Sequence, residues 1–200
     1  MDLKNQKKVF AGLQSNTAFT LVEIMVVIGI LSILSAVALP GMFNPEYKLK
    51  KAARELMGDM QKTRSMAIKT NTQWGIWFDT ANDRYLIFSS PGTDGAWSGI
   101  DTDGSQPTEK EVTFSGYAAG VQYGHGAATK TVTGSTSFPI NGTTFSGEVL
   151  TFNPKGLCSP ALTGYGNRYV YIAYNDMTYA LGTGSTGVVR IYRWNGSDWK

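Results

Sequence analysis

An apolar run from Phe19 to Leu39 constrains this chain more than any other feature. The run covers 21 residues, and Glu23 is the only charged residue within it. A helix of about 20 apolar residues crosses the roughly 30 Å hydrocarbon core of a bilayer, so the run predicts a transmembrane helix over residues 19–39. Because a carboxylate at the bilayer centre costs about 2.5–3.5 kcal/mol, the run also predicts a partner charge for Glu23.

The segment before the run is short and basic, and it contains Lys4, Lys7 and Lys8. Such lysines favour the cytoplasmic side of a membrane, so we expect a cytoplasmic N-terminus and an extracytoplasmic C-terminal domain. A conventional secretory signal carries its apolar stretch before the cleavage site. Residues 1–18 contain no such stretch.

Residues 18–23, Ala-Phe-Thr-Leu-Val-Glu, resemble the prepilin peptidase signature of type IV pilins and type II secretion pseudopilins. In that family a membrane protease cuts before the Phe and methylates the new amino terminus. The resemblance implies that the leader 1–18 is removed, that Ala18 precedes the cut and that Phe19 becomes the N-methylated terminus. It also implies that Glu23 is the assembly carboxylate and that Pro40 is the family's helix-kinking proline. The family prefers Gly where this chain has Ala18.

Electrostatics is consistent with this role of Glu23. A free α-amino group at Phe19 would lie one helical turn from the carboxylate, and so would that of a neighbouring chain shifted along the axis. Opposite charges attract strongly where the dielectric constant is low, but desolvation offsets much of the gain. We therefore expect such a pair to set the register of assembly more than to add affinity.

Residues 40–72 predict a kink followed by an amphipathic helix. Pro40 and Pro45 interrupt helical hydrogen bonding, which places the kink near residues 40–46. Small or apolar residues then recur at helical spacing and should face a globular domain; they are Leu49, Ala53, Leu56, Met60, Thr63 and Ala67. The charged residues are expected outside this stripe; they are Lys51, Arg54, Glu55, Asp59 and Lys62.

Residues 73–200 predict an extracytoplasmic β-domain. Strand-like runs lie at 74–79, 85–90, 111–115, 121–123, 148–152, 168–174, 178–181 and 188–194, and the turn-rich residues 91–110 are expected to form a loop. The turn 153–156, the terminal run 187–193 and the pattern of the preceding helix resemble the GspH/FimT branch of the pilin family. The expected fold is α+β and pilin-like: a long N-terminal helix, half transmembrane and half amphipathic, packed on an antiparallel β-domain of two sheets.

Two ligands are worth considering for the β-domain. FimT-like minor pilins are implicated in DNA uptake, and Arg190 and Arg193 could contact phosphate while nearby aromatic residues stack on bases. However, the two arginines fall on opposite or staggered positions of a strand, and a solvated sheet face is the simpler interpretation. The run 101–105 has oxygen ligands for calcium, but Gly104 lies fourth rather than sixth from its start, unlike an EF-hand loop.

Catalytic chemistry finds no support in the sequence. The single histidine, His125, lies in a Gly-rich stretch, and the single cysteine, Cys158, cannot form an internal disulfide. No Ser/His/Asp grouping, zinc spacing or phosphate-binding loop is visible. We therefore predict a non-enzymatic protein without a cofactor or bound metal.

The sequence predicts a structural minor pilin or pseudopilin of a type II secretion pseudopilus or type IV pilus, processed by prepilin peptidase. Expected partners are the major pilin, other minor pilins and the inner-membrane assembly platform. The expected location is the inner membrane, as a single-pass protein with a periplasmic domain. A DNA-binding minor pilin and a plain membrane-anchored binding domain are the alternatives.

Overall fold

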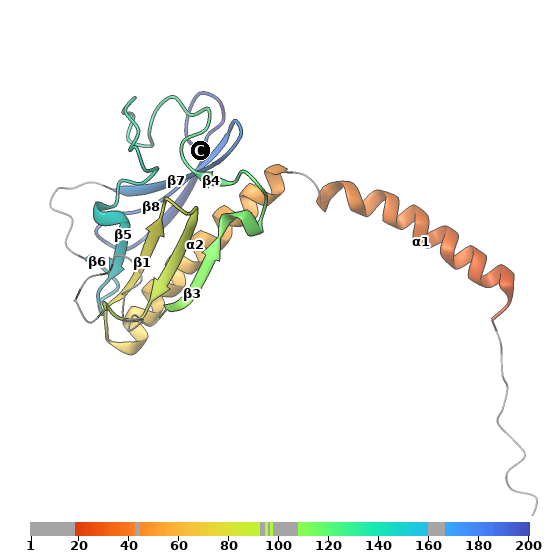
Figure 1. Ribbon diagram of the computed structural model, residues 1–200, viewed down its shortest axis with the longest axis horizontal. Helices are drawn as coiled ribbons and strands as arrows, with labels where there is room; N and C mark the ends of the chain where they lie inside the picture. Colours follow the sequence, from red (N-terminus) through yellow and green to blue (C-terminus); the bar gives the residue numbers. More distant parts are fainter. Residues whose placement is uncertain (1–18, 43–44, 93–94, 96, 98–107, 160–166) are drawn as a thin grey trace, which may run out of the picture. The chain divides into compact units, whose positions relative to one another are not determined.

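The computed structural model describes residues 19–42, 45–92, 95, 97, 108–159 and 167–200 of the 200-residue chain (Figure 1). They belong to two units, Met1–Phe43 and Asn44–Lys200. The leader 1–18 and the run 101–105, which was considered for calcium, lie outside the described residues.

Among the described residues of the first unit, Leu21–Met42 form the helix α1. This helix carries apolar side chains on all sides. The hydroxyl groups of Ser32 and Ser35 donate hydrogen bonds to the backbone carbonyls of Ile28 and Leu31, each at 2.7 Å. The helical backbone runs past Pro40 to Met42, so the kink at Pro40 stays a prediction. Of the helices in the described part of the chain, none is long and apolar enough to cross a membrane. The transmembrane span over residues 19–39 stays a prediction.

The second unit begins with α2, Pro45–Thr70. All six residues of the predicted stripe are buried, with at most 1% of each exposed, which confirms the expected amphipathic face. Asp59 differs from the prediction, because it is only 6% exposed rather than outside the stripe. Its carboxylate is held by two side chains of the β-domain that lie far away in the sequence.

In the part of the chain that the structure describes, nine strands form two antiparallel sheets. The five-stranded sheet has the order β3-β2-β1-β5-β6 and the four-stranded sheet the order β4-β7-β8-β9. The strands are β1 Trp74–Asp79, β2 Arg84–Phe88, β3 Thr108–Thr113, β4 Gln122–Tyr123, β5 Val149–Phe152, β6 Cys158–Ser159, β7 Arg168–Tyr174, β8 Met177–Thr183 and β9 Val189–Arg193. Short 3-10 helices cover Phe114–Gly116 and Ser146–Glu148. A helix on two antiparallel sheets is the predicted α+β, pilin-like fold.

Strand positions match the sequence pattern closely, with two exceptions. β1 and β7 have the predicted bounds, whereas β3 begins at Thr108, inside the expected loop 91–110. The pattern also missed β6, whose two residues are too few to show an alternation.

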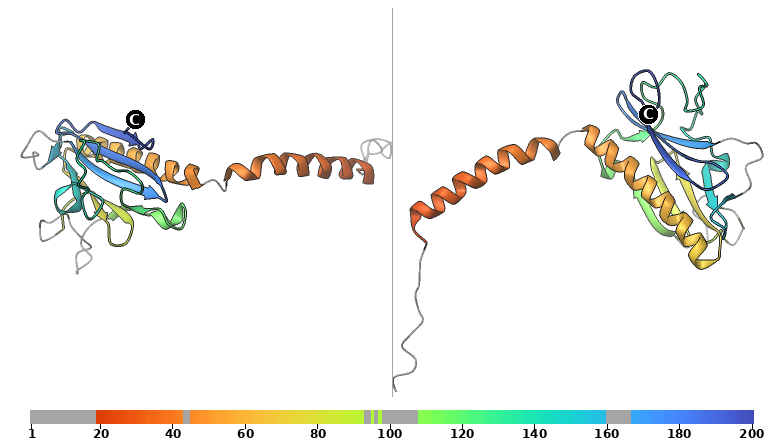
Figure 2. Two further views of the ribbon diagram at one scale, coloured as in Figure 1. Left: turned by 90° about the horizontal axis from the view of Figure 1, so that it is seen from above. Right: turned by 180° about the vertical axis from the view of Figure 1, so that it is seen from behind.

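The core lies where α2 packs against strands of both sheets (Figure 2, right). Alternate strand residues point into it, such as Ile76 and Phe78 of β1 and Val170 and Ile172 of β7, each fully buried. Successive side chains of a strand point to opposite faces. The residues between them therefore face away from α2, which places Tyr169, Tyr171 and Ala180 in a second, smaller cluster on the outer side of the four-stranded sheet.

Candidate assembly site

The start of α1 is built by a helix cap. The backbone N–H of Glu23 donates to Thr20 Oγ1 at 3.2 Å, and the N–H of Ile24 donates to the Thr20 carbonyl at 3.2 Å. Thr20 is therefore the N-cap and Glu23 the third helical residue, which is the spacing of a capping box. This geometry gives Glu23 a defined place in the first turn of the helix.

The carboxylate of Glu23 is exposed, and within the described residues it forms no ion pair. Free N–H groups and the helix dipole favour a negative charge in the first turn of a helix. Phe19, which is 73% exposed, precedes the cap and lies four residues from Glu23. Ala18, the predicted residue before the cut, lies outside the described residues.

Side chains around Glu23 leave the helix apolar on every side. Leu21, Val22 and Met25 are 75%, 68% and 64% exposed in the single chain. A helix that is apolar all round is normally buried, either in a protein core or in a membrane. The exposed face next to Glu23 is therefore suited to contact with lipid or with other apolar helices.

A closed polar network ties α2 to β2 and β3. Asp59 Oδ2 accepts hydrogen bonds from Tyr85 at 2.6 Å and from Lys110 Nζ at 2.7 Å, and Lys110 also binds Glu55 Oε1 at 2.9 Å. Partial burial opposes protonation of Lys110, but its bonds to the two carboxylates raise its pKa. Bonds from Tyr117 and Lys110 lower the pKa of Glu55. Because its members satisfy one another, this network has a structural role.

The two arginines considered for DNA binding, Arg190 and Arg193, are not brought together. They lie three residues apart on β9, and so on opposite faces of the strand. Arg193 faces α2 and pairs with Glu46 at 2.5 Å, whereas Arg190 is exposed on the outer face. The aromatic residue Trp199 is likewise engaged, because its Nε1 donates to the carbonyl of Lys130 at 2.7 Å.

Other candidate ligands are occupied by local structure. His125 stacks on Phe138 with ring centroids 4.0 Å apart, and its Nδ1 lies 3.1 Å from the carbonyl oxygen of Ala128. Cys158 is buried beside Thr183, and burial raises the pKa of its thiol. Over the part of the chain that the structure describes, no group of His, Cys, Asp and Glu side chains could hold a metal ion.

Sequence reasoning missed two features that position the candidate site residues. One is the cap at Thr20, although the spacing Thr-x-x-Glu in residues 20–23 was a readable signal. The other is the pairing of Arg193 with Glu46, which joins residues far apart in the sequence and leaves no local signal.

Two known sequence families match this chain. The family described as type II transport protein GspH matches residues 52–193, and the prokaryotic N-terminal methylation motif matches residues 13–39. No curated protein matches the chain.

Two solved structures are similar in fold. The type IV minor pilin FimU of Pseudomonas aeruginosa is 19% identical, with a TM-score of 0.48, over 79% of this chain and 96% of its own. The minor pseudopilin EpsH from the Type 2 Secretion System of Vibrio cholerae is 12% identical, with a TM-score of 0.43, over 72% of this chain and 95% of its own.

The GspH match covers most of the second unit, and the methylation motif covers the apolar run that contains Glu23. The chain therefore belongs to the GspH family of type II transport proteins and is a minor pilin or pseudopilin.

Proposed function

We propose that prepilin peptidase cuts this chain between Ala18 and Phe19, methylates Phe19, and so prepares it to enter a filament through Glu23. Before assembly, residues 19–39 hold the chain in the inner membrane, with residues 1–18 in the cytoplasm and residues 73–200 in the periplasm. The observation that carries the proposal is the exposed carboxylate of Glu23, capped into the first turn of an apolar helix and without an ion pair in the described residues.

Cleavage supplies the missing charge. The amide of Phe19 becomes a cationic amino group, one helical turn from Glu23 in the same chain. In a filament the same carboxylate can meet the amino terminus of a neighbouring subunit that is shifted along the axis. A buried ion pair adds little net stability, but breaking one is costly, so the pair selects one register of entry.

The apolar surface of α1 is well suited to storage and to assembly. In the membrane it contacts lipid, and in the filament it packs against the corresponding helices of the major pilin and other minor pilins. The inner-membrane assembly platform would transfer the subunit between these two environments. Lipid tails and helix surfaces are similarly apolar, so the exchange needs specific polar contacts such as that of Glu23.

The mature N-terminus is the decisive measurement. Mass spectrometry of the chain purified from cells that make the peptidase should find residues 1–18 absent and Phe19 methylated. Ala18→Gly should be cut at least as fast as the native chain, because it restores the residue that the family prefers. A chain that still begins at Met1 would refute processing and leave a plain membrane-anchored domain as the better description.

The role of Glu23 is tested by its incorporation into filaments. Glu23→Gln keeps the size of the side chain and the backbone cap but removes the charge, and we expect incorporation to fall by roughly tenfold or more, which corresponds to about 1.4 kcal/mol. Ser32→Ala is the matched control, since it also changes a polar residue of α1, one whose hydroxyl binds within the helix. Normal incorporation of Glu23→Gln would exclude the charge as the register device.

A further inference from the structure

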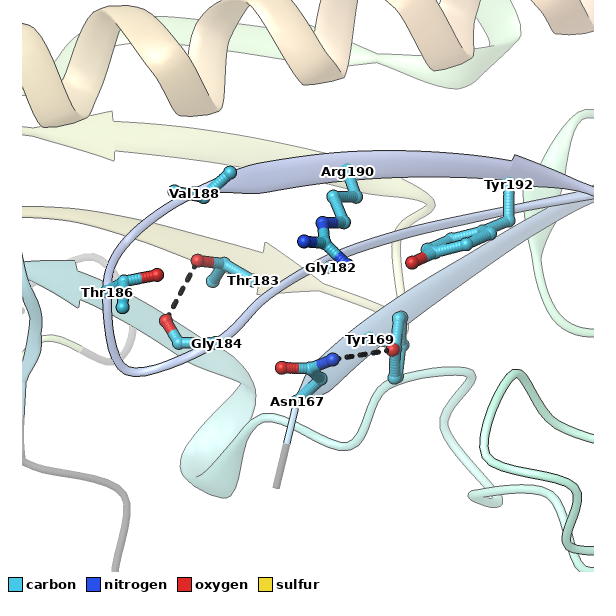
Figure 3. Close-up of a pocket in the computed structure, with 9 residues that line it drawn as sticks. All are labelled: Asn167, Tyr169, Gly182, Thr183, Gly184, Thr186, Val188, Arg190 and Tyr192. Carbon is cyan, nitrogen blue, oxygen red and sulfur yellow. Dashed lines mark hydrogen bonds between the residues drawn. The ribbon is translucent and has the colours of Figure 1, made fainter. Parts of the chain in front are cut away.

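A small pocket lies on the outer face of the four-stranded sheet, beside the turn that joins β8 to β9 (Figure 3). Its volume is about 80 Å³. The side chains of Asn167, Tyr169, Arg190 and Tyr192 surround Gly182 in it. These residues alternate with core residues along their strands, so the pocket faces away from α2.

Arg190 gives the pocket its charge. It is exposed, and within the described residues it forms no ion pair, unlike Arg193 on the opposite face of the same strand, which pairs with Glu46. A guanidinium group carries five N–H donors and stays protonated at any physiological pH. The pocket therefore presents one full positive charge and several donors that no carboxylate of the described chain satisfies.

Neutral hydrogen-bonding groups complete the lining. Asn167 Nδ2 donates to Tyr169 Oη at 3.2 Å, and the ring of Tyr192 meets that of Tyr169 edge-on with centroids 6.0 Å apart. Burial raises the pKa of Tyr169, so its phenol stays protonated at neutral pH. The wall opposite Arg190 is thus polar and uncharged.

Two glycines keep the pocket open. A Cβ on Gly182 would lie 2.3 Å from the Tyr169 ring, and a Cβ on Gly184 would lie 2.6 Å from Asn167 Oδ1. Any larger residue at either position would displace the side chain that lines the pocket. Glycine weakens a strand interior, and it often marks a place where a ligand or another backbone approaches closely.

Size and charge restrict the ligand. The pocket is about half as large as a closed cavity of about 150 Å³ that accepts benzene, so it cannot enclose a nucleobase or a sugar ring. One guanidinium group matches a group with a single negative charge, and planar carboxylates bind arginine through two parallel hydrogen bonds. A phosphate monoester, with a charge of about −1.5 to −2, carries more charge than this lining balances.

We propose that the pocket binds the carboxylate of an acidic side chain on a neighbouring filament subunit, an inference that rests on the proposed assembly function. Val188, 47% exposed at the rim, would contact the same neighbour. An exposed ion pair contributes little by itself, about 0–1 kcal/mol. In a filament the α1 helices already hold the neighbours together, so the second contact forms at high effective concentration and orients the β-domain.

Cross-linking of the full-length chain in cells identifies the occupant. Val188 is replaced by the photoreactive residue p-benzoylphenylalanine, and cross-linked peptides from sheared filaments are sequenced by mass spectrometry. We expect a cross-link to a peptide of another subunit that contains Asp or Glu. Cross-links only to peptides without an acidic residue, or to nucleic acid, would overturn the proposal.

Charge reversal at Arg190 provides a second test of the pocket. Arg190→Glu should lower incorporation several-fold, and a Glu→Lys or Asp→Lys change at the cross-linked residue should restore it. Lys155→Glu is the control, because it makes the same change of charge at an exposed turn outside the pocket. Thermal unfolding of each variant shows whether the domain is intact.

The two proposals fail in different ways. Normal incorporation of Arg190→Glu, while Glu23→Gln is excluded from filaments, would overturn the carboxylate pocket and leave the assembly function standing. Absence of the native chain from filaments would overturn both.

Discussion

The two long helices of this chain are similar in length but place their leucines in opposite environments. α1 has 22 residues, and its Leu21 and Leu31 are 75% and 56% exposed. α2 has 26 residues, and its Leu49 and Leu56 are fully buried. The difference lies in the distribution of polar residues, because α2 has a charged face and α1 has none.

The two helices therefore contribute to stability in different ways. The apolar face of α2 packs against the sheets of its own domain, so α2 stabilises that domain directly. The apolar side chains of α1 are exposed within its own unit, so any stabilisation from them requires a contact outside that unit. Substitutions in the two helices should therefore affect different measurements.

The largest expected effect on stability comes from the core of α2. Leu56→Ala should lower the free energy of unfolding by about 2–5 kcal/mol, because it leaves a cavity under two sheets. Leu31→Ala is the matched change in α1, and it should leave domain unfolding unchanged within about 0.5 kcal/mol. Urea unfolding followed by tryptophan fluorescence measures both, since all five tryptophans lie between residues 74 and 199. Equal effects of the two changes would contradict the view that α2, and not α1, stabilises the domain.

The next largest effect concerns the polar network between α2 and the sheet. Asp59→Asn should cost about 1–3 kcal/mol, because it leaves the buried site without the charge that Lys110 and Tyr85 bind. Glu55→Gln changes a carboxylate that is 36% exposed in the same network, and it should cost less than about 1 kcal/mol. The same urea titration compares them. A larger loss of unfolding free energy for Glu55→Gln than for Asp59→Asn would show that the exposed carboxylate contributes more to stability than the buried one.

A smaller effect appears in the dependence of stability on pH. The hydrogen bond from Tyr117 and the contact with Lys110 lower the pKa of Glu55 below 4.5, the ordinary value of a glutamate side chain. A lowered folded-state pKa stabilises the domain above the unfolded-state value, and the gain is lost as the pH falls through the folded-state pKa. Glu55→Gln should therefore flatten the loss of stability below about pH 4.5.

Glu109 offers the control for this titration, because it is exposed and forms no ion pair in the described residues. Glu109→Gln should leave the pH profile of unfolding unchanged. If both variants give the native profile, Glu55 does not contribute to the pH dependence.

The sequence predicted the parts of the fold that depend on local periodicity. The buried stripe of α2 and the alternation of β1 and β7 follow from periods of 3.6 and 2, and the structure confirms them. The burial of Asp59 was predicted wrongly. Its partners Tyr85 and Lys110 lie 26 and 51 residues away, so no local pattern reports them.

The candidate site residues likewise fall into those that a local pattern predicts and those that depend on contacts between distant segments. The cleavage signature and Glu23 were readable because they form one short motif, and their roles stay predictions. The separation of Arg190 from Arg193 also follows from strand periodicity, since residues three apart point to opposite faces. Neither the pairing of Arg193 with Glu46 nor the pocket around Arg190 was predictable, because both join distant segments.

The most local effect should come from the cap of α1. Thr20→Ala removes the acceptor for the Glu23 N–H and should destabilise the first turn by about 1 kcal/mol. Hydrogen exchange at Glu23 in detergent micelles should then be faster by roughly fivefold. Thr20→Ser keeps the hydroxyl group and should restore slow exchange.

Comparison with Glu23→Gln separates the position of the carboxylate from its charge. Thr20→Ala leaves the charge but loosens the turn that holds it, whereas Glu23→Gln keeps the cap and removes the charge. If the register depends mainly on charge, Thr20→Ala should lower filament incorporation only a few-fold, less than Glu23→Gln does. Equal losses would show that a fixed first turn matters as much as the charge, and no loss would show that the N-terminal pair forms its own geometry after cleavage.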